Sequence, residues 1–170
     1  MIRSDLSRRH LVFGLAVTGV FGLAACSRKS EASQQTGGLS GDGGAAPPIM
    51  TVYRDPNCPC CEEWVKIAER EGFTVRMVED SDMPTRKKAL GVPAQLVSCH
   101  TAQLAGLVFE GHVPIAHIKQ LMTDGGPFIG LAVPGMPRGS PGMEMPDGAK
   151  DPFDVIGFDR SGRTAVFARG

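Results

Sequence analysis

The chain has 170 residues, no net charge at neutral pH and a hydrophobic fraction of 42%. This length and apolar content are enough for one folded core, and the balanced charge gives no indication of nucleic-acid binding. The distinctive residues are the five cysteines and eight methionines, because several of them lie in polar or Gly-rich stretches where a core residue is not expected. We therefore expect the sulfur atoms to indicate the function.

Residues 1–25 have the features of an export signal. Arg8 and Arg9 precede an apolar run over 11–25, which is shorter than a comfortable membrane-spanning helix. The run ends in LAAC, which places Cys26 in a lipoprotein cleavage box. We expect a signal that resembles the twin-arginine type, and a mature chain in the periplasm or cell envelope that is anchored by a lipid on Cys26. The alternative is an ordinary cleaved signal in which Cys26 has no such role.

Residues 26–48 are predicted to be a flexible linker. Gly, Ser, Gln and Ala dominate this stretch, which contains QQTGGLSGDGGAAPP and almost no apolar residues. The folded domain is therefore predicted over 49–170. Four of the five cysteines fall within it, all of them in two short motifs.

Strand and helix patterns alternate along the predicted domain. The predicted elements are a strand over 49–55, a helix from the cysteine cluster to Gly72, a strand over 73–80, a helix over 83–92, two strands within 93–113 and a helix over 114–126. A β-α-β unit followed by a hairpin and a helix predicts an α/β, thioredoxin-like fold. The segments DVIGFD and TAVFAR are predicted to form an added C-terminal β-hairpin.

Three cysteines occupy four positions at the start of the first predicted helix. The unpaired amide groups and the positive end of the helix dipole favour thiolates there, and a thiolate serves both as a nucleophile and as a metal ligand. Cys58 and Cys61 have the CxxC spacing of a redox pair, and Pro59 stiffens the turn between them. Cys60 is surplus to such a pair, because a third thiol invites disulfide exchange and over-oxidation.

The second cysteine motif is SCHT, in which Cys99 and His100 are adjacent. Neighbouring side chains of a regular strand point to opposite faces, so the two residues can serve one site only at a strand end or a bulge. His112 precedes a predicted helix, and we interpret it as a hydrogen-bonded loop residue, although an outer ligand is the alternative. His117 falls within that helix and is interpreted as facing solvent.

A Gly/Pro-rich segment over 130–148 contains Met136, Met143 and Met145. Its length without a helix or strand pattern predicts a loop that is functional or disordered. The methionines follow neither a helical nor a strand period, as core methionines normally do. Thioether ligation is therefore one hypothesis for them, and chance placement in a loop is the other.

Several motifs together resemble the CopG-like family of bacterial periplasmic copper-resistance proteins, long catalogued as a domain of unknown function. The motifs are YRDPNCPCCEEW, LGVP, SCHTA, EGHVP, GLAVPGMPRGSPGME and DVIGFDRSGRTAVFAR, and they span nearly all of residues 50–170. The resemblance implies a thioredoxin-like domain that binds copper, with several ions in a thiolate-bridged cluster. The ligands it implies are Cys58, Cys60 and Cys61 of a CxCC motif and Cys99 and His100 of a CH motif. Family members often carry Gly where Pro59 stands here.

The chemistry of these side chains agrees with copper. Soft thiolates and thioethers select Cu(I), whereas imidazole accepts Cu(I), Cu(II) or Zn(II). Structural zinc sites tend to use two CxxC-like pairs, while the adjacent thiols of Cys60 and Cys61 are better suited to bridging several ions. The candidate metal ligands are Cys58, Cys60, Cys61, Cys99, His100, Met136 and Met143. We predict a protein that handles copper ions, alone or with other envelope copper-handling proteins. Interconversion of Cu(I) and Cu(II) at the same site is left open.

Two alternatives remain at this stage. The first is a thiol–disulfide oxidoreductase in which Cys58 is the nucleophile, Cys61 resolves the mixed disulfide and Pro93 faces the pair. Such an enzyme needs neither Cys60 nor the Cys99–His100 motif. The second is a disulfide-stabilised scaffold without a site, although a disulfide that closes so short a loop adds little stability.

Overall fold

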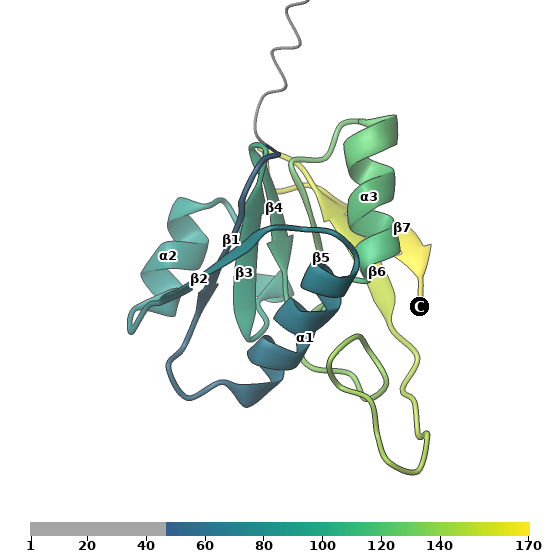
Figure 1. Ribbon diagram of the computed structural model, residues 1–170. Coiled ribbons are helices and arrows are strands. Elements are labelled where there is room, and N and C mark those ends of the chain that lie inside the picture. The colour runs from purple at the N-terminus through teal and green to yellow at the C-terminus, as the bar shows by residue number, and fades with distance from the viewer. Residues whose placement is uncertain (1–46) are drawn as a thin grey trace, which may run out of the picture. The chain divides into compact units, whose positions relative to one another are not determined.

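The computed structural model describes residues 47–170, so the predicted export signal and most of the predicted linker lie outside the described residues. Its centre is a seven-stranded sheet with the strand order β2-β1-β3-β4-β5-β6-β7 (Figure 1). The strands are β1 (Met50–Arg54), β2 (Val75–Glu79), β3 (His100–Leu104), β4 (Leu107–Glu110), β5 (Gly130–Ala132), β6 (Asp154–Phe158) and β7 (Thr164–Arg169). The helices are α1 (Pro59–Arg70), α2 (Met83–Ala89) and α3 (Ile115–Asp124), with a short 3-10 helix, η1 (Ala94–Leu96).

The sheet is mixed, and its pairing follows from the connections. β1 and β2 are parallel and are joined through α1, and β4 and β5 are parallel and are joined through α3. The other neighbouring pairs are antiparallel. The predicted mixed α/β class is therefore confirmed, and the predicted C-terminal hairpin is present as β6 and β7. None of the helices within residues 47–170 is long and apolar enough to cross a membrane.

One prediction about the fold was wrong. Residues 130–148 were predicted to lack regular structure, but the first three of them form β5, which connects the C-terminal hairpin to the rest of the sheet. All three residues of β5 are buried, so the strand has no polar face, and a run this short shows no alternation in the sequence. Gly130 is required in β5, because a Cβ there would overlap the Val108 carbonyl oxygen and the Phe158 ring.

Apolar side chains on the two faces of the sheet form two clusters. α1 and α3 cover one face, where Trp64 is fully buried and donates its indole N–H to the Val113 carbonyl at 3.0 Å. The opposite face carries a smaller cluster around Phe158 and Val108. Adjacent residues of β4, Val108 and Phe109, face opposite clusters, as the two-residue period of a strand requires.

A buried ion pair joins α2 to the face of the sheet that lies opposite α1 and α3. Lys87, 4% exposed, donates to the Glu110 carboxylate at 2.6 Å and to the Thr101 hydroxyl at 3.0 Å. The same carboxylate accepts the Thr101 hydroxyl at 2.6 Å and the backbone N–H of Ser98 at 2.7 Å. Glu110 is fully buried, and each of its oxygens has a partner. This network holds the chain immediately before β3 against β4.

Breaking this pair from one side is expected to be costly. Lys87→Met leaves a buried carboxylate without its cation, so we expect the free energy of unfolding to fall by about 3–5 kcal/mol in urea titrations. The double variant Lys87→Met/Glu110→Gln has no buried charge and keeps an acceptor for Ser98, so its loss should be smaller than the sum of the two single losses. A loss below about 1 kcal/mol for Lys87→Met would show that the pair is not structurally important.

Candidate metal centre

The CxCC cysteines lie at the N-terminus of α1. Cys58 is the N-cap residue and Pro59 is the first helical residue, a position where the missing N–H costs nothing. Cys58 and Cys61 form a disulfide, whereas Cys60 is free and its sulfur lies 3.5 Å from that of Cys58. Cys61 is fully buried, while Cys58 and Cys60 are partly exposed. The disulfide therefore joins a partly exposed residue to a fully buried one.

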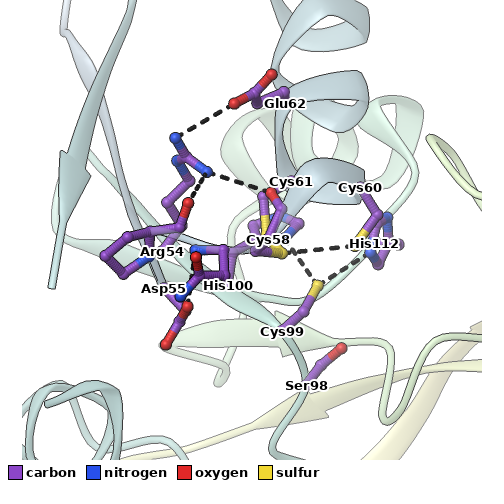
Figure 2. Close-up of a disulfide and its surroundings, with 12 residues drawn as sticks. Arg54, Asp55, Cys58, Cys60, Cys61, Glu62, Ser98, Cys99, His100 and His112 are labelled. Atoms are coloured by element: carbon purple, nitrogen blue, oxygen red, sulfur yellow. Dashed lines mark hydrogen bonds and ion pairs between the residues drawn. A yellow bond between two sulfur atoms is a disulfide. The ribbon is translucent and has the colours of Figure 1, made fainter. Parts of the chain in front are cut away.

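Arg54, at the end of β1, holds the loop that carries these cysteines. Its guanidinium donates to the carbonyl oxygens of Pro56 and Cys58 at 3.2 and 3.3 Å. It also forms an ion pair with Glu62 at 3.2 Å, which Figure 2 shows, and a second one with Glu79 at 3.2 Å. Because Arg54 is only 7% exposed, these contacts connect β1, the loop and α1 through a largely desolvated cation.

Cys99 and His100 lie at a strand end. β3 begins at His100, so the Cys99 side chain does not have to point to the face opposite that of His100. The Cys99 sulfur lies 3.2 Å from His100 Nδ1. This removes the geometric objection to their serving one site. The sulfur atoms of Cys58, Cys60, Cys61 and Cys99 all lie within 4.8 Å of one another. Figure 2 shows the Cys99 sulfur directed towards the cysteines of α1.

His112 belongs to the same site, whereas the sequence interpretation favoured a hydrogen-bonded loop residue over an outer ligand. Its Nε2 lies 3.0 Å from the Cys99 sulfur, and the residue is fully buried. The turn of the β3–β4 hairpin carries the signal that would have found it. Leu104 pairs with Leu107 across a two-residue turn, and the same register continued backwards sets Cys99 opposite His112.

The hydrogen bond to Pro141 determines which nitrogen of His112 carries the proton. Nδ1 lies 2.7 Å from the Pro141 carbonyl oxygen, which can only accept, so Nδ1 donates. In the neutral ring Nε2 then presents its lone pair to the Cys99 sulfur. Burial lowers the pKa of His112, although Pro141 and Glu144 act in the opposite direction. The Pro141 carbonyl thus orients the imidazole as such a group does for a metal-binding histidine.

His100 is a fully buried imidazole between Trp64 and His112. Its ring centroid lies 4.7 Å from the indole and 5.1 Å from the His112 ring. Burial lowers the pKa of His100 well below its usual value, and His112 and Lys87 add to the effect. Its Nε2 has no hydrogen-bond partner among the described residues. The ring is therefore neutral at physiological pH, which is the form that binds metals.

The methionine candidates occupy different positions. Met136 is exposed and lines a hollow of about 440 Å³ together with Cys58, Cys60 and Cys99. Met143 is half-buried and is not among the described residues that line this hollow. Pro93, which was expected to face the CxxC pair, precedes η1 and does not line it either. Of the two candidate methionines, the structure brings Met136 to the mouth of the cysteine cluster.

The described residues form two potential metal-binding groups that share one atom. The first consists of the four cysteine sulfurs, and the second of the Cys99 sulfur with ring nitrogens of His100 and His112. Four cysteine sulfurs and two neutral imidazoles suit a soft or borderline ion. The disulfide withholds two of the four sulfurs from coordination, so the complete donor set requires its reduction to two thiols.

The reactivity of Cys99 offers a test of this geometry. Burial raises the pKa of the Cys99 thiol to about 12, and the neighbouring Cys60 acts in the same direction. In the native, metal-free chain we expect its alkylation rate, followed by peptide mass spectrometry, to keep rising from about pH 7 to about pH 11. In the urea-unfolded chain the rate should level off near pH 9, around the ordinary cysteine pKa. Levelling at the same pH in both states would contradict this burial.

Comparisons with known proteins gave a match to a family model and matches to solved structures. A family model described as "Protein of unknown function, DUF411" matches residues 96–143, and the comparison with curated proteins gave no match. Two solved structures of copper resistance protein copG, forms 1 and 2, are 46% and 45% identical to this chain, each with a TM-score of 0.69. Each match covers 74% of this chain, with 98% of the form 1 chain and 99% of the form 2 chain. The chain therefore belongs to the CopG family of copper resistance proteins.

Proposed function

We propose that this protein binds copper in the cell envelope and that its four cysteines, with His100 and His112, form a site for more than one Cu(I) ion. The support is the clustering of soft donors, together with the similarity to solved structures of a copper resistance protein. Thiolate sulfur selects Cu(I) over harder ions, and imidazole completes such a site. This protein would thereby bind, hold or pass on copper, the activity expected of a copper-resistance or homeostasis protein.

The observation that carries the proposal is the position of the Cys99 sulfur, which belongs to both donor groups. A single tetrahedral ion uses four ligands, whereas the two groups together offer six donor atoms, the Cys99 sulfur included. A thiolate can bridge two cations and spread its negative charge over both. Cys99 is therefore proposed as a bridging ligand between an ion on the α1 side and an ion on the histidine side.

Two wider predictions belong to the same proposal. We propose that β1, α1, β2, β3, β4 and α3 make a thioredoxin-like unit, supported by the parallel β1–β2 pair and the antiparallel β3–β4 hairpin. We also propose export by the signal over 1–25 and a lipid anchor on Cys26. The support for export is the sequence pattern alone, because these residues lie outside the described part of the chain.

Metal analysis of the full chain tests the copper site. Fully reduced under nitrogen and desalted, the protein should retain more than one Cu(I) per chain. Cys60→Ser should lower that ratio by removing one thiolate, and Cys99→Ser should lower it further because its sulfur serves both groups. Cys26→Ser is the matched control, since it removes a thiol predicted to lie in the anchor.

Well-folded, reduced protein that retains no copper, or that retains one Zn(II) in preference to copper, would contradict the proposal. An unchanged copper ratio in Cys99→Ser would contradict the bridging role.

The disulfide supports a second, redox candidate. Cys58 is accessible and Cys61 is buried, as expected for an attacking and a resolving cysteine at a helix start. Two reactions are compatible with this pair. One is thiol–disulfide exchange with another protein, and the other is reduction of copper. In the latter, the two thiols give two electrons to two Cu(II) ions, which yields two Cu(I) ions, the Cys58–Cys61 disulfide and two protons.

Anaerobic titration of the reduced, copper-free chain with Cu(II) separates these reactions. Copper reduction predicts about two Cu(I) formed per Cys58–Cys61 disulfide, with Cu(I) measured by a chromophoric chelator and the disulfide by peptide mass spectrometry. Cys61→Ser should abolish this stoichiometry. Turnover of a model disulfide by copper-free protein, largely unchanged in Cys60→Ser, would favour the thiol–disulfide oxidoreductase instead.

A further inference from the structure

Met136 is an exposed thioether at the opening of the cysteine cluster. The residue is 54% exposed, although methionine is an apolar residue that is usually buried. It lines the same hollow as Cys58, Cys60 and Cys99, and it is the only methionine of the described residues that does so. Its position is therefore not explained by packing into either apolar cluster.

The backbone next to Met136 is attached to the backbone next to Cys99. Ser98 and Gly135 form an isolated parallel β-bridge, and the Gly135 N–H donates to the Val97 carbonyl at 3.5 Å. The Ser98 hydroxyl also donates to the Gly135 carbonyl. Since Met136 directly follows Gly135 and Cys99 directly follows Ser98, these contacts hold the thioether and the thiol at one opening.

The 130–148 segment that carries Met136 also packs against α1, at Gly142. Gly142 has a φ of 81°, and a Cβ there would lie 2.8 Å from the backbone nitrogen of Trp64 and 3.3 Å from the Cys60 carbonyl oxygen. The loop therefore packs against the helical turn that carries the cysteines. Both attachments make Met136 part of the mouth of the site, and not part of a freely moving loop.

Three of the four clustered cysteines line this hollow, whereas a second pocket, on the α2 side, is lined by Cys99 alone of the four. Cys61, His100 and His112 are fully buried, whereas the three cysteines that line the hollow are partly exposed. An ion that enters through the hollow meets Met136 at its wall. A thioether is soft, uncharged and has no proton to lose, whereas a thiol must release its proton before it binds a metal.

We propose that Met136 is a capture ligand, which takes Cu(I) from a donor at the protein surface and transfers it to the cysteines below. In the transfer, the bond between copper and the thioether sulfur breaks as a bond to the Cys60 or Cys99 sulfur forms. The thiol proton leaves to solvent, and copper stays Cu(I) throughout. This inference rests on the proposed copper function. Met136 would determine how fast copper is loaded, and it would not be a ligand of copper in the loaded site.

Loading kinetics of the full, reduced chain test this role. The probe is Cu(I) held by a chromophoric chelator at limiting concentration, and its transfer is followed by stopped-flow absorbance under nitrogen. Met136→Leu keeps the apolar bulk but removes the sulfur. We expect it to load more slowly by about tenfold, with an unchanged final copper ratio. Met145→Leu is the matched control, because Met145 is also exposed in the same segment but does not line the hollow, and it should load within about twofold of the parent.

Each other result overturns the inference in a different way. Equal loading rates for Met136→Leu and the parent would exclude a capture role. A fall in the final copper ratio of Met136→Leu would make Met136 a permanent ligand instead. If the parent chain takes up no Cu(I), the proposed copper function itself fails, and the capture role fails with it.

Discussion

The register of β3 against its two neighbours is the constraint on which the site depends. Arg54, the last residue of β1, pairs with His100, the first residue of β3. The loop after β1 and the residue before β3 therefore leave the sheet at the same end of these two strands. On the other side of β3, the two-residue turn at Ala105 and Gly106 sets the pairing with β4. A slip of one residue in either pairing would send the site residues to the wrong face or the wrong neighbour.

These two registers bring together segments that are far apart in the chain. The β1 pairing brings the α1 cysteines to Cys99, and the β4 pairing brings His112 to the other side of the same sulfur. The buried Lys87–Glu110 pair supports this arrangement, because the carboxylate holds the N–H of Ser98. Arg54 does the same for the carbonyl oxygen of Cys58. Charged residues next to the site thus fix the backbone. The donor groups of Cys99, His100 and His112 are themselves partly or fully buried, and they are uncharged.

The neutrality of the donors has a chemical consequence. A buried thiol with a raised pKa and two buried imidazoles with lowered pKa values hold no charge at physiological pH. A cation that replaces the thiol protons supplies the positive charge that this environment lacks, so binding is coupled to proton release. The disulfide adds a second condition, because two of the four sulfurs become donors only after two-electron reduction. Copper loading and the thiol redox state are therefore linked in this account.

Much of this arrangement could be predicted from the sequence, and the failures have physical causes. The helices and most strands are long enough for their periods to be read, whereas β5 has three residues and no polar face. The CxCC cysteines were candidates because three sulfurs crowd the start of one helix, and Cys99 and His100 were candidates through the resemblance to the copper-resistance family. His112 was set aside because it gains its role from strand pairing, which a single residue does not reveal. The Cys58–Cys61 disulfide matches the CxxC spacing, but spacing alone left open whether these thiols are bonded to each other or to metal.

The Cys99 sulfur is proposed to bridge copper ions between the α1 cysteines and the two histidines. X-ray absorption spectroscopy at the copper edge, on the reduced full chain loaded with Cu(I), tests this bridging. A bridging Cys99 sulfur predicts a sulfur-dominated coordination shell with copper–copper scattering, and loss of that scattering in Cys99→Ser. A shell of nitrogen and oxygen alone, or a sulfur shell without any copper–copper scattering in the parent chain, would contradict it.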